Sequence, residues 1–201
     1  MLSLRVDGLQ SSSVYQVQFT VEDDEGHLVR GASQPVVTTG PLPRLLLSEV
    51  MASPPLPVPR TEGEYIEILN AGNSPTDLSS VSLLGVDGIP RPVAPGVTSA
   101  VVLAPGARAL AVGASFDPGR YPIPPGVPVL RASTQRLLGR GLSDESPPSI
   151  ALLATDAYGT IAEVDRYPGG EPKCAAGESI EAALGDGWVC GAYGGSPGRA
   201  P

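Results

Sequence analysis

Residues 64–70 alternate apolar and polar side chains with a period of two, and this pattern constrains the fold more than any other. Successive side chains of an extended strand point to opposite faces, so Ile66 and Ile68 share one face and Glu67 lies on the other. Asn70, followed closely by a glycine, favours a turn at the end of the run. We therefore expect a strand whose isoleucines are buried and whose Glu67 lies on a solvated face.

Further short runs of apolar or alternating residues recur along the chain. Turn-forming residues separate them, and the chain holds 25 glycines and 23 prolines, which interrupt long helices and suit turns. Many short strands joined by polar turns predict an all-β fold, a β-sandwich. Residues 179–184 are compatible with either one helical turn or a strand. The expected strands comprise residues 45–50, 65–69, 81–84, 100–103, 109–112, 127–130, 150–153 and 161–167.

The first part of the chain has its own group of strands. Alternating residues predict strands at residues 2–6, 15–21 and 36–39, and residues 22–26 form an acidic turn. A short linker rich in proline follows and is stiff for its length. The predicted organisation is an N-terminal unit, a linker and a main domain, at residues 1–40, 41–44 and 45–201 respectively.

The net charge of −8 at pH 7 restricts the partners of the chain. An acidic surface repels phosphate backbones and anionic headgroups, so nucleic acid and membrane surfaces are not expected partners. The most apolar stretch, residues 99–114, is interrupted by Pro105, Gly106 and Arg108 and is too broken to span a bilayer. The first residues also lack the basic start and apolar core of a signal peptide.

The two cysteines, Cys174 and Cys190, are close enough in sequence for a disulfide that closes a short loop. Such a bond stabilises a chain by about 3 kcal/mol, chiefly by restricting the unfolded state. Two free thiols and half of a metal site are the alternatives, although the single histidine, His27, is far away in sequence. We expect the disulfide, and with it an oxidising compartment, which conflicts with the missing signal peptide.

Residues 194–198 match the Gly-x-Ser-x-Gly pattern of a hydrolase nucleophile elbow. That motif requires a helix directly after the serine, whereas Pro197 and Gly198 follow Ser196 here. The only histidine, His27, lies in the N-terminal unit, so a catalytic triad is not expected. A turn explains the pattern better, and we predict no catalytic residue and no cofactor.

Acidic residues gather in two places along the sequence. Glu49, Glu64 and Glu67, with Asp77, would serve a glycosidase or bind calcium only if the fold held their carboxylates together. Residues 22–25 are the densest negative run, and calcium is the ligand to weigh there as well. Ordinary surface charge explains both groups more simply, because neighbouring strand residues point to opposite sides. Calcium and glycan ligands therefore stay open as alternatives.

Gly8, Leu9 and Tyr15 precede a strand and an Asp-rich turn in the N-terminal unit. This order resembles the second half of a fibronectin type III module. The resemblance implies that Tyr15 packs at a strand corner and that four upstream strands are absent. Half a sandwich leaves an apolar face that must find cover. We expect a reading frame truncated at Met1; the alternative is that these strands pack on something else.

Several motifs of residues 45–200 occur in a particular order. They are an opening strand at residues 48–52, the strand at 64–70, a late strand at 164–167 and a closing segment at 195–200. In this order and spacing the region resembles the lamin tail domain. The resemblance implies an immunoglobulin-like β-sandwich.

The resemblance also implies structural roles for single residues. Ser80 and Val81 stand where the family usually has Gly-Trp, so Val81 would take a core position. Trp188, the only tryptophan, is expected in the core; a surface aromatic for sugar binding is the alternative. The matching positions are Glu49, Tyr65, Ile66, Glu67, Ile68, Asn70, Asp77, Leu78, Pro105, Gly106, Asp165, Trp188, Pro197 and Gly198.

In function, the resemblance implies a non-catalytic structural or protein-interaction module. Bacterial domains of this kind belong to larger exported or cell-surface proteins, often beside fibronectin type III modules or hydrolases. Sheet edges and loops would contact a protein partner. The main alternative is an accessory ligand-binding module, for a polysaccharide or calcium, of a secreted hydrolase. An intracellular scaffold is a further alternative, and an enzyme is not expected.

Overall fold

The structure is a computed structural model that describes residues 6, 9, 13–38, 40–94, 101–142, 147–183 and 187–200. The chain forms two compact units: unit 1 comprises residues 1–42 and 155–162, and unit 2 comprises residues 43–154 and 163–201. Strands dominate both units, and among the described residues the four-residue α1 (Arg60–Gly63) is the one α-helix. None of the described helices is long and apolar enough to cross a membrane. The protein is all-β, as its many short strands and turns predict.

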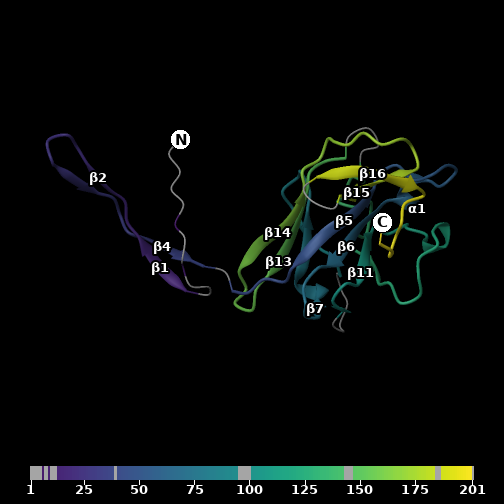
Figure 1. The fold of residues 1–201 in the computed structure, drawn as a ribbon, viewed down its shortest axis with the longest axis horizontal. Coiled ribbons are helices and arrows are strands. Elements are labelled where there is room, and N and C mark those ends of the chain that lie inside the picture. The colour runs from purple at the N-terminus through teal and green to yellow at the C-terminus, as the bar shows by residue number, and fades with distance from the viewer. Residues whose placement is uncertain are drawn as a thin grey trace. The chain divides into compact units, whose positions relative to one another are not determined.

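Unit 1 contains two separate two-stranded antiparallel ladders (Figure 1). β1 (Val14–Val17) pairs with β4 (Gln34–Val37), and β2 (Thr20–Glu22) pairs with β3 (Leu28–Arg30). The acidic turn lies between β2 and β3, where the sequence predicts it.

The strand expected at residues 15–21 is in fact two strands. The side-chain amide of Gln18 donates to the carbonyl oxygen of Gly31 at 3.0 Å. At the break between the two ladders, this carbonyl therefore accepts a hydrogen bond from a side chain. β3 is an additional strand, and β4 begins earlier than the strand expected at residues 36–39. Thr39, and residues 2–5 of the first expected strand, lie outside the described residues.

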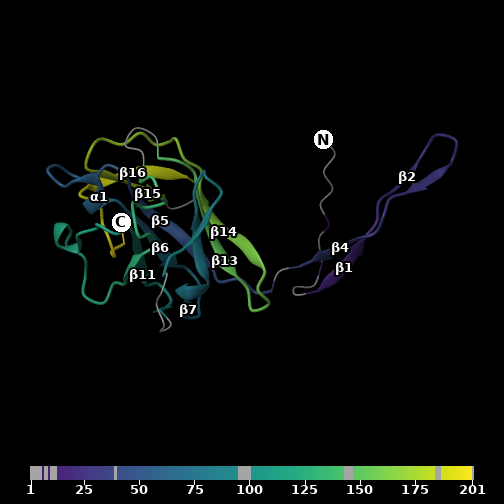
Figure 2. The same ribbon diagram turned by 180° about the vertical axis from the view of Figure 1, so that it is seen from behind.

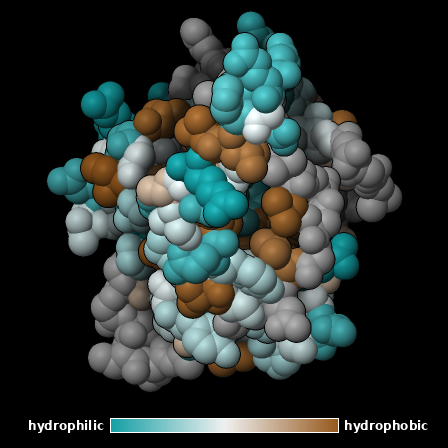
Figure 3. All heavy atoms as spheres, turned by 90° about the vertical axis from the view of Figure 1, so that its left-hand side faces the viewer, coloured by the Kyte–Doolittle hydropathy of each residue, from teal (hydrophilic) through white to brown (hydrophobic). Residues whose placement is uncertain are grey.

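Apolar side chains of unit 1 lie at its surface. Figure 3 shows one face of the molecule, on which brown apolar groups lie between teal hydrophilic ones. A two-stranded ribbon has no second layer that would bury one of its faces, and Phe19 is accordingly 63% exposed. The large exposed apolar residues of the four strands and of the segment between β1 and β2 are Val14, Phe19, Val21, Leu28, Val29 and Val36.

Unit 2 consists mainly of two sheets that pack face to face (Figures 1 and 2). The larger sheet has the order β12-β11-β6-β5-β15-β16, and β11 and β12 pair in parallel. Its strands are β5 (Leu45–Met51), β6 (Tyr65–Asn70), β11 (Arg108–Val112), β12 (Val129–Arg131), β15 (Glu178–Ala182) and β16 (Trp188–Tyr193).

The smaller sheet has the order β14-β13-β8-β9. Its strands are β8 (Val81–Leu84), β9 (Pro90–Pro92), β13 (Ile150–Thr155) and β14 (Ile161–Tyr167). A short ladder joins β7 (Thr76–Asp77) to β10 (Val102–Leu103). The described part of the unit also contains two 3₁₀ turns, η1 (Leu78–Ser80) and η2 (Pro118–Arg120).

The main core lies between the two sheets. Ile66 and Ile68 of β6 are fully buried in it, as the alternation of residues 64–70 predicts. Leu83 and Leu152, which are paired across β8 and β13, contribute from the smaller sheet. Each such side chain stabilises the fold by roughly 1.5–3 kcal/mol when it leaves water. Val81, which stands where the lamin tail family usually has a tryptophan, is also fully buried.

The outer face of the larger sheet is buried as well, so the expectation of a solvated Glu67 is wrong. Glu67 is only 1% exposed. A second apolar cluster lies on this face and includes residues of the connection between β11 and β12. Alternation along one strand shows which residues share a face, but it cannot show that both faces are covered. The buried members of this cluster are Met51, Tyr65, Leu110, Val112, Phe116 and Tyr121.

Cys174 and Cys190 form a disulfide, which confirms the predicted pairing and excludes the free-thiol alternative. Cys190 lies on β16, so the bond ties the edge strand of the larger sheet to the segment before β15. Residues 178–182 form β15, which resolves the choice between helix and strand in favour of a strand. Leu184, the end of that segment, lies outside the described residues.

Candidate functional site

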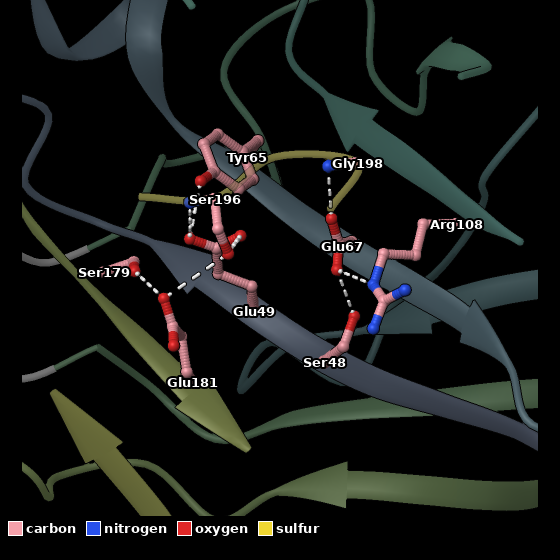
Figure 4. A network of polar contacts seen from close by, with 9 residues as sticks. All are labelled: Ser48, Glu49, Tyr65, Glu67, Arg108, Ser179, Glu181, Ser196 and Gly198. Carbon is pink, nitrogen blue, oxygen red and sulfur yellow. Dashed lines mark hydrogen bonds and ion pairs between the residues drawn. The ribbon is translucent and has the colours of Figure 1, made fainter. Parts of the chain in front are cut away.

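Three glutamates stand side by side on the outer face of the larger sheet (Figure 4). Glu181 of β15 is directly opposite Glu49 of β5, and Glu49 is directly opposite Glu67 of β6. Opposed residues of neighbouring strands point to the same face, so the register forms a row of carboxyl groups. All three residues are buried. We call them the glutamate row.

Glu49, in the middle of the row, accepts hydrogen bonds from two directions. The Tyr65 hydroxyl donates to Glu49 Oε1 at 2.8 Å, and the backbone N–H of Ser196 donates to the same oxygen at 2.8 Å. The Ser196 hydroxyl donates to Oε2 at a longer 3.4 Å. Burial nevertheless raises the pKa of Glu49, because loss of water disfavours its charged form more than these donors favour it. Burial beside Glu49 raises the pKa of Tyr65 as well, so the phenol stays a proton donor.

Glu67, at one end of the row, has two hydrogen-bond donors and one ion-pair partner. The Ser48 hydroxyl lies 2.6 Å from Oε1, and the Gly198 N–H lies 2.5 Å from Oε2. Arg108 Nε forms an ion pair with Oε1 at 2.9 Å, although this N–H is not aligned as a hydrogen bond. Burial outweighs these contacts and raises the pKa of Glu67 to about 7.

Glu181, at the other end, has weaker contacts. The Ser179 hydroxyl donates to Glu181 Oε1 at 3.0 Å, and the Ser196 hydroxyl lies 3.5 Å from the same oxygen. Ser196 therefore stands between two carboxyl groups and links both to the end of the chain.

Residues 194–199, the C-terminal strap, cover the glutamate row without forming a helix or strand. A Cβ atom on Gly195 would lie 2.2 Å from Tyr65 Oη and 2.5 Å from Glu49 Oε1. Gly195 also has a φ of +67°, a conformation that side chains with a Cβ rarely adopt. Glycine is thus required at position 195, where the strap backbone approaches the carboxyl groups closely.

These contacts explain the Gly-x-Ser-x-Gly pattern. The Ser196 hydroxyl donates to two carboxyl groups, and the chain continues after it as a turn. His27, the only histidine, is an exposed residue of unit 1 and lies 3.0 Å from Asp23 through Nδ1. The buried row also offers no open face on which a polysaccharide would meet two carboxyl groups.

The structure brings Glu49 and Glu67 together but places the other two predicted carboxylates elsewhere. Glu64 lies 3.3 Å from Arg60 in an ion pair and accepts the N–H of Leu142 at 3.1 Å. Asp77 accepts the N–H of Ser79 at 2.9 Å and caps η1. Neither belongs to the row, so these carboxylates do not form one calcium site.

Other residues at which the chain resembles the lamin tail domain stabilise turns and connect the sheets. The side-chain amide of Asn70 donates to the Leu103 carbonyl oxygen at 2.8 Å, and Gly106 donates to the Asn70 carbonyl oxygen at 2.8 Å. These bonds hold the turn that contains Pro105 next to the end of β6.

Two further positions of the pattern join separate elements of unit 2. Asp165 of β14 accepts the N–H of Leu47 at 2.6 Å, which connects the two sheets. Trp188 is partly buried and meets the ring of Tyr167 edge-on at 4.8 Å, so it borders the main core.

Sequence reasoning missed Ser48, Arg108, Ser179 and Glu181 as members of this network. Ser179 and Glu181 alternate with Ile180, so a strand at residues 178–182 would have placed both on one face. No local pattern indicates that Ser48 and Arg108 would be covered.

Metal ligands gather at one place among the described residues. Cys174, Glu178 and Cys190 have ligand atoms within 4.8 Å of one another, but both sulfur atoms belong to the disulfide. The acidic turn of unit 1 uses its first aspartate internally: Asp23 accepts the N–H groups of Glu25 at 3.0 Å and His27 at 2.8 Å. These bonds lower the pKa of Asp23, with the bond from the His27 backbone as the largest cause.

Comparison of the chain with protein-family models, curated proteins and solved structures yields no match.

Proposed function

We propose that this chain is a non-catalytic protein-interaction module of a larger exported or cell-surface bacterial protein. Within it, unit 2 is an immunoglobulin-like sandwich of the lamin tail type, and unit 1 is part of a fibronectin type III-like module. The two-sheet arrangement of unit 2 supports this reading. So does the meeting of motif residues, because Glu49 and Glu67 accept the backbone N–H groups of Ser196 and Gly198 in the closing segment.

The observation that carries the proposal is the apolar surface of unit 1. Val14, Phe19, Val21, Leu28 and Val29 are all more than half exposed. Groups of exposed apolar side chains on soluble proteins mark places where another surface binds. Covering each of these side chains would contribute roughly 1.5–3 kcal/mol. A polypeptide partner with apolar side chains fits this surface.

The disulfide and the buried carboxylates support the other parts of the proposal. Stable disulfides are typical of oxidising compartments, which supports export. The glutamate row is buried and serves as an anchor for the strap, which supports a structural role over catalysis. Unit 2 then acts as the stable part of the module.

Site-specific crosslinking on the whole chain tests the proposal. A benzoylphenylalanine residue replaces Phe19, and a matched control replaces Val102, an exposed residue of unit 2. In the exported fraction of the producing cells, we expect position 19 to crosslink to one defined protein and position 102 to none. A Phe19→Asp chain added in excess should not compete, whereas the unaltered chain should. Equal labelling at both positions, or an unfolding midpoint raised by calcium or glycans without any crosslink, would overturn it.

A further inference from the structure

The glutamate row contains more carboxyl groups than there are cationic side chains paired with it. Glu181, Glu49 and Glu67 lie in direct register, and among the described residues Arg108 is the one cationic side chain that forms an ion pair with them. Like charges directly opposite one another destabilise a pair of strands. Full ionisation of the row therefore costs free energy for as long as the row stays buried.

The remaining groups around the row add little compensation. Tyr65 of β6 and Tyr121 of the β11–β12 connection are held neutral, because burial raises the pKa of both phenols. Arg199 of the strap donates to the Pro122 carbonyl oxygen at 3.0 Å and forms no ion pair with the row. The balance near Glu49 and Glu67 thus depends on Arg108, on dipoles and on protons.

The strap is attached to the body mainly through polar contacts with this row. Ser196 and Gly198 donate their backbone N–H groups to Glu49 and Glu67. Outside the row, Gly194 donates to the Gly177 carbonyl oxygen at 2.6 Å. Pro197 is its one buried residue, so apolar burial contributes little. The protonation state of the row therefore has a large influence on whether the strap stays in place.

We propose that the strap and the glutamate row form a pH-sensitive latch, which is closed while the row holds a proton and loosens as the row becomes fully ionised. Lifting the strap returns the carboxyl groups to water, where their charged forms are stable. The raised pKa values of Glu49 and Glu67 agree with this direction.

The sign follows from the two states of Glu67. With the strap in place its pKa is about 7, and in water it returns to about 4.5. Closing the latch therefore takes up a proton between these two values. Closure is fully favoured below about pH 4.5, weakens as the pH rises to about 7, and changes no further above that.

Hydrogen exchange on the whole chain tests the latch between pH 5 and pH 8. Corrected for intrinsic exchange rates, the protection of residues 194–199 should fall by up to about tenfold per pH unit from pH 5 to pH 7. It should then level off, while the amides of β5 and β6 keep their protection. Glu67→Gln, which keeps the shape but cannot ionise, should flatten this dependence. Asp87→Asn, at an exposed pair with Arg91 on the smaller sheet, should leave it unchanged.

Protection of the strap that stays constant or rises with pH in the unaltered chain would overturn the proposal. The same holds if Glu67→Gln and Asp87→Asn give identical profiles. If Glu67→Gln also lowers the protection of β5 and β6, the substitution has disturbed the sheet itself. The pH dependence of strap protection in the unaltered chain then tests the proposal alone.

Discussion

At the scale of single residues, Arg108 and Glu67 form an ion pair that is almost entirely withdrawn from water. Their side chains are 15% and 1% exposed. Replacing one partner of a buried pair leaves the other charge uncompensated, so Arg108→Gln should lower the free energy of unfolding by about 3 kcal/mol at pH 8. The loss should be smaller at pH 5, because Glu67, with a pKa of about 7, then holds a proton. Urea unfolding followed by circular dichroism at the two pH values measures both losses.

Arg91→Gln is the matched control for that substitution. Arg91 pairs with Asp87 near the surface, where ion pairs contribute at most about 1 kcal/mol. Its hydrogen bonds to Arg91 lower the pKa of Asp87 to about 2, so this pair stays ionised throughout the range from pH 5 to pH 8. We expect a small loss that is the same at both pH values. An equally pH-independent loss for Arg108→Gln would contradict the protonation of Glu67.

Gly195 and Gly194 provide a second test at this scale. Both have positive φ angles, of +67° and +86°, but a Cβ on Gly194 would meet nothing within 4 Å. Gly194→Ala should therefore cost only the backbone strain of about 1 kcal/mol. Gly195→Ala should cost at least about 2 kcal/mol, since the strap must also move away from Tyr65 and Glu49. Thermal unfolding of the two variants measures the difference, and equal costs would show that the strap does not press on the row.

Glu67 also shows where single-residue reasoning from sequence ends. The alternation of β6 correctly places Ile66 and Ile68 in the core. It cannot reveal that residues far along the chain, around Phe116 and Ser196, cover the opposite face. Those segments are rich in glycine and proline and read as exposed turns, because turn chemistry carries no information about what the turn lies on.

At the scale of elements, the disulfide attaches β16 to the rest of unit 2. Its cysteines are 16 residues apart, and a loop of that size corresponds to about 3 kcal/mol of stabilisation. A chain with both Cys174→Ser and Cys190→Ser should lose that amount of unfolding free energy. Denaturant unfolding of the double variant, with the unaltered chain in the presence of reductant as control, measures it. A loss in reductant but none in the double variant would mean that the cross-link itself does not stabilise the fold.

Strands with regular alternation were predictable, and irregular ones were not. β5, β6, β8, β11, β13 and β14 lie where apolar residues recur with a period of two or in short runs. β16 contains Cys190 and Gly191, and β9 begins and ends in proline, so neither has the composition of a typical strand. Both form because a neighbouring strand offers its backbone, which is a property of the sheet and not of the segment.

At the scale of the whole molecule, the two units should differ in local stability. None of the unit 1 strand residues whose burial the structure describes is buried, whereas β5, β6 and β11 are buried along most of their length. Amides that are hydrogen-bonded only within a two-stranded ladder exchange their hydrogens through small local openings of that ladder. Hydrogen exchange by mass spectrometry should show β2 and β3 exchanging within seconds at neutral pH. β5, β6 and β11 should exchange only through global unfolding.

The core of unit 2 is the internal control for that experiment, because denaturant should accelerate exchange there and leave the ribbons unchanged. Equal protection of β2 and β6 in the isolated chain would contradict the proposal that the apolar surface of unit 1 awaits a partner. Slower amide exchange in β2 and β3 after addition of the partner identified by crosslinking would support it.

Trp188 lies two residues before Cys190 on β16, so both side chains stand on the same side of that strand. A disulfide quenches the fluorescence of a nearby indole, and Trp188 is the only tryptophan of the chain. We therefore expect its emission to report on a single bond at a single sheet edge. Opening of the cross-link should then brighten this emission, so that oxidation could be followed without an added dye.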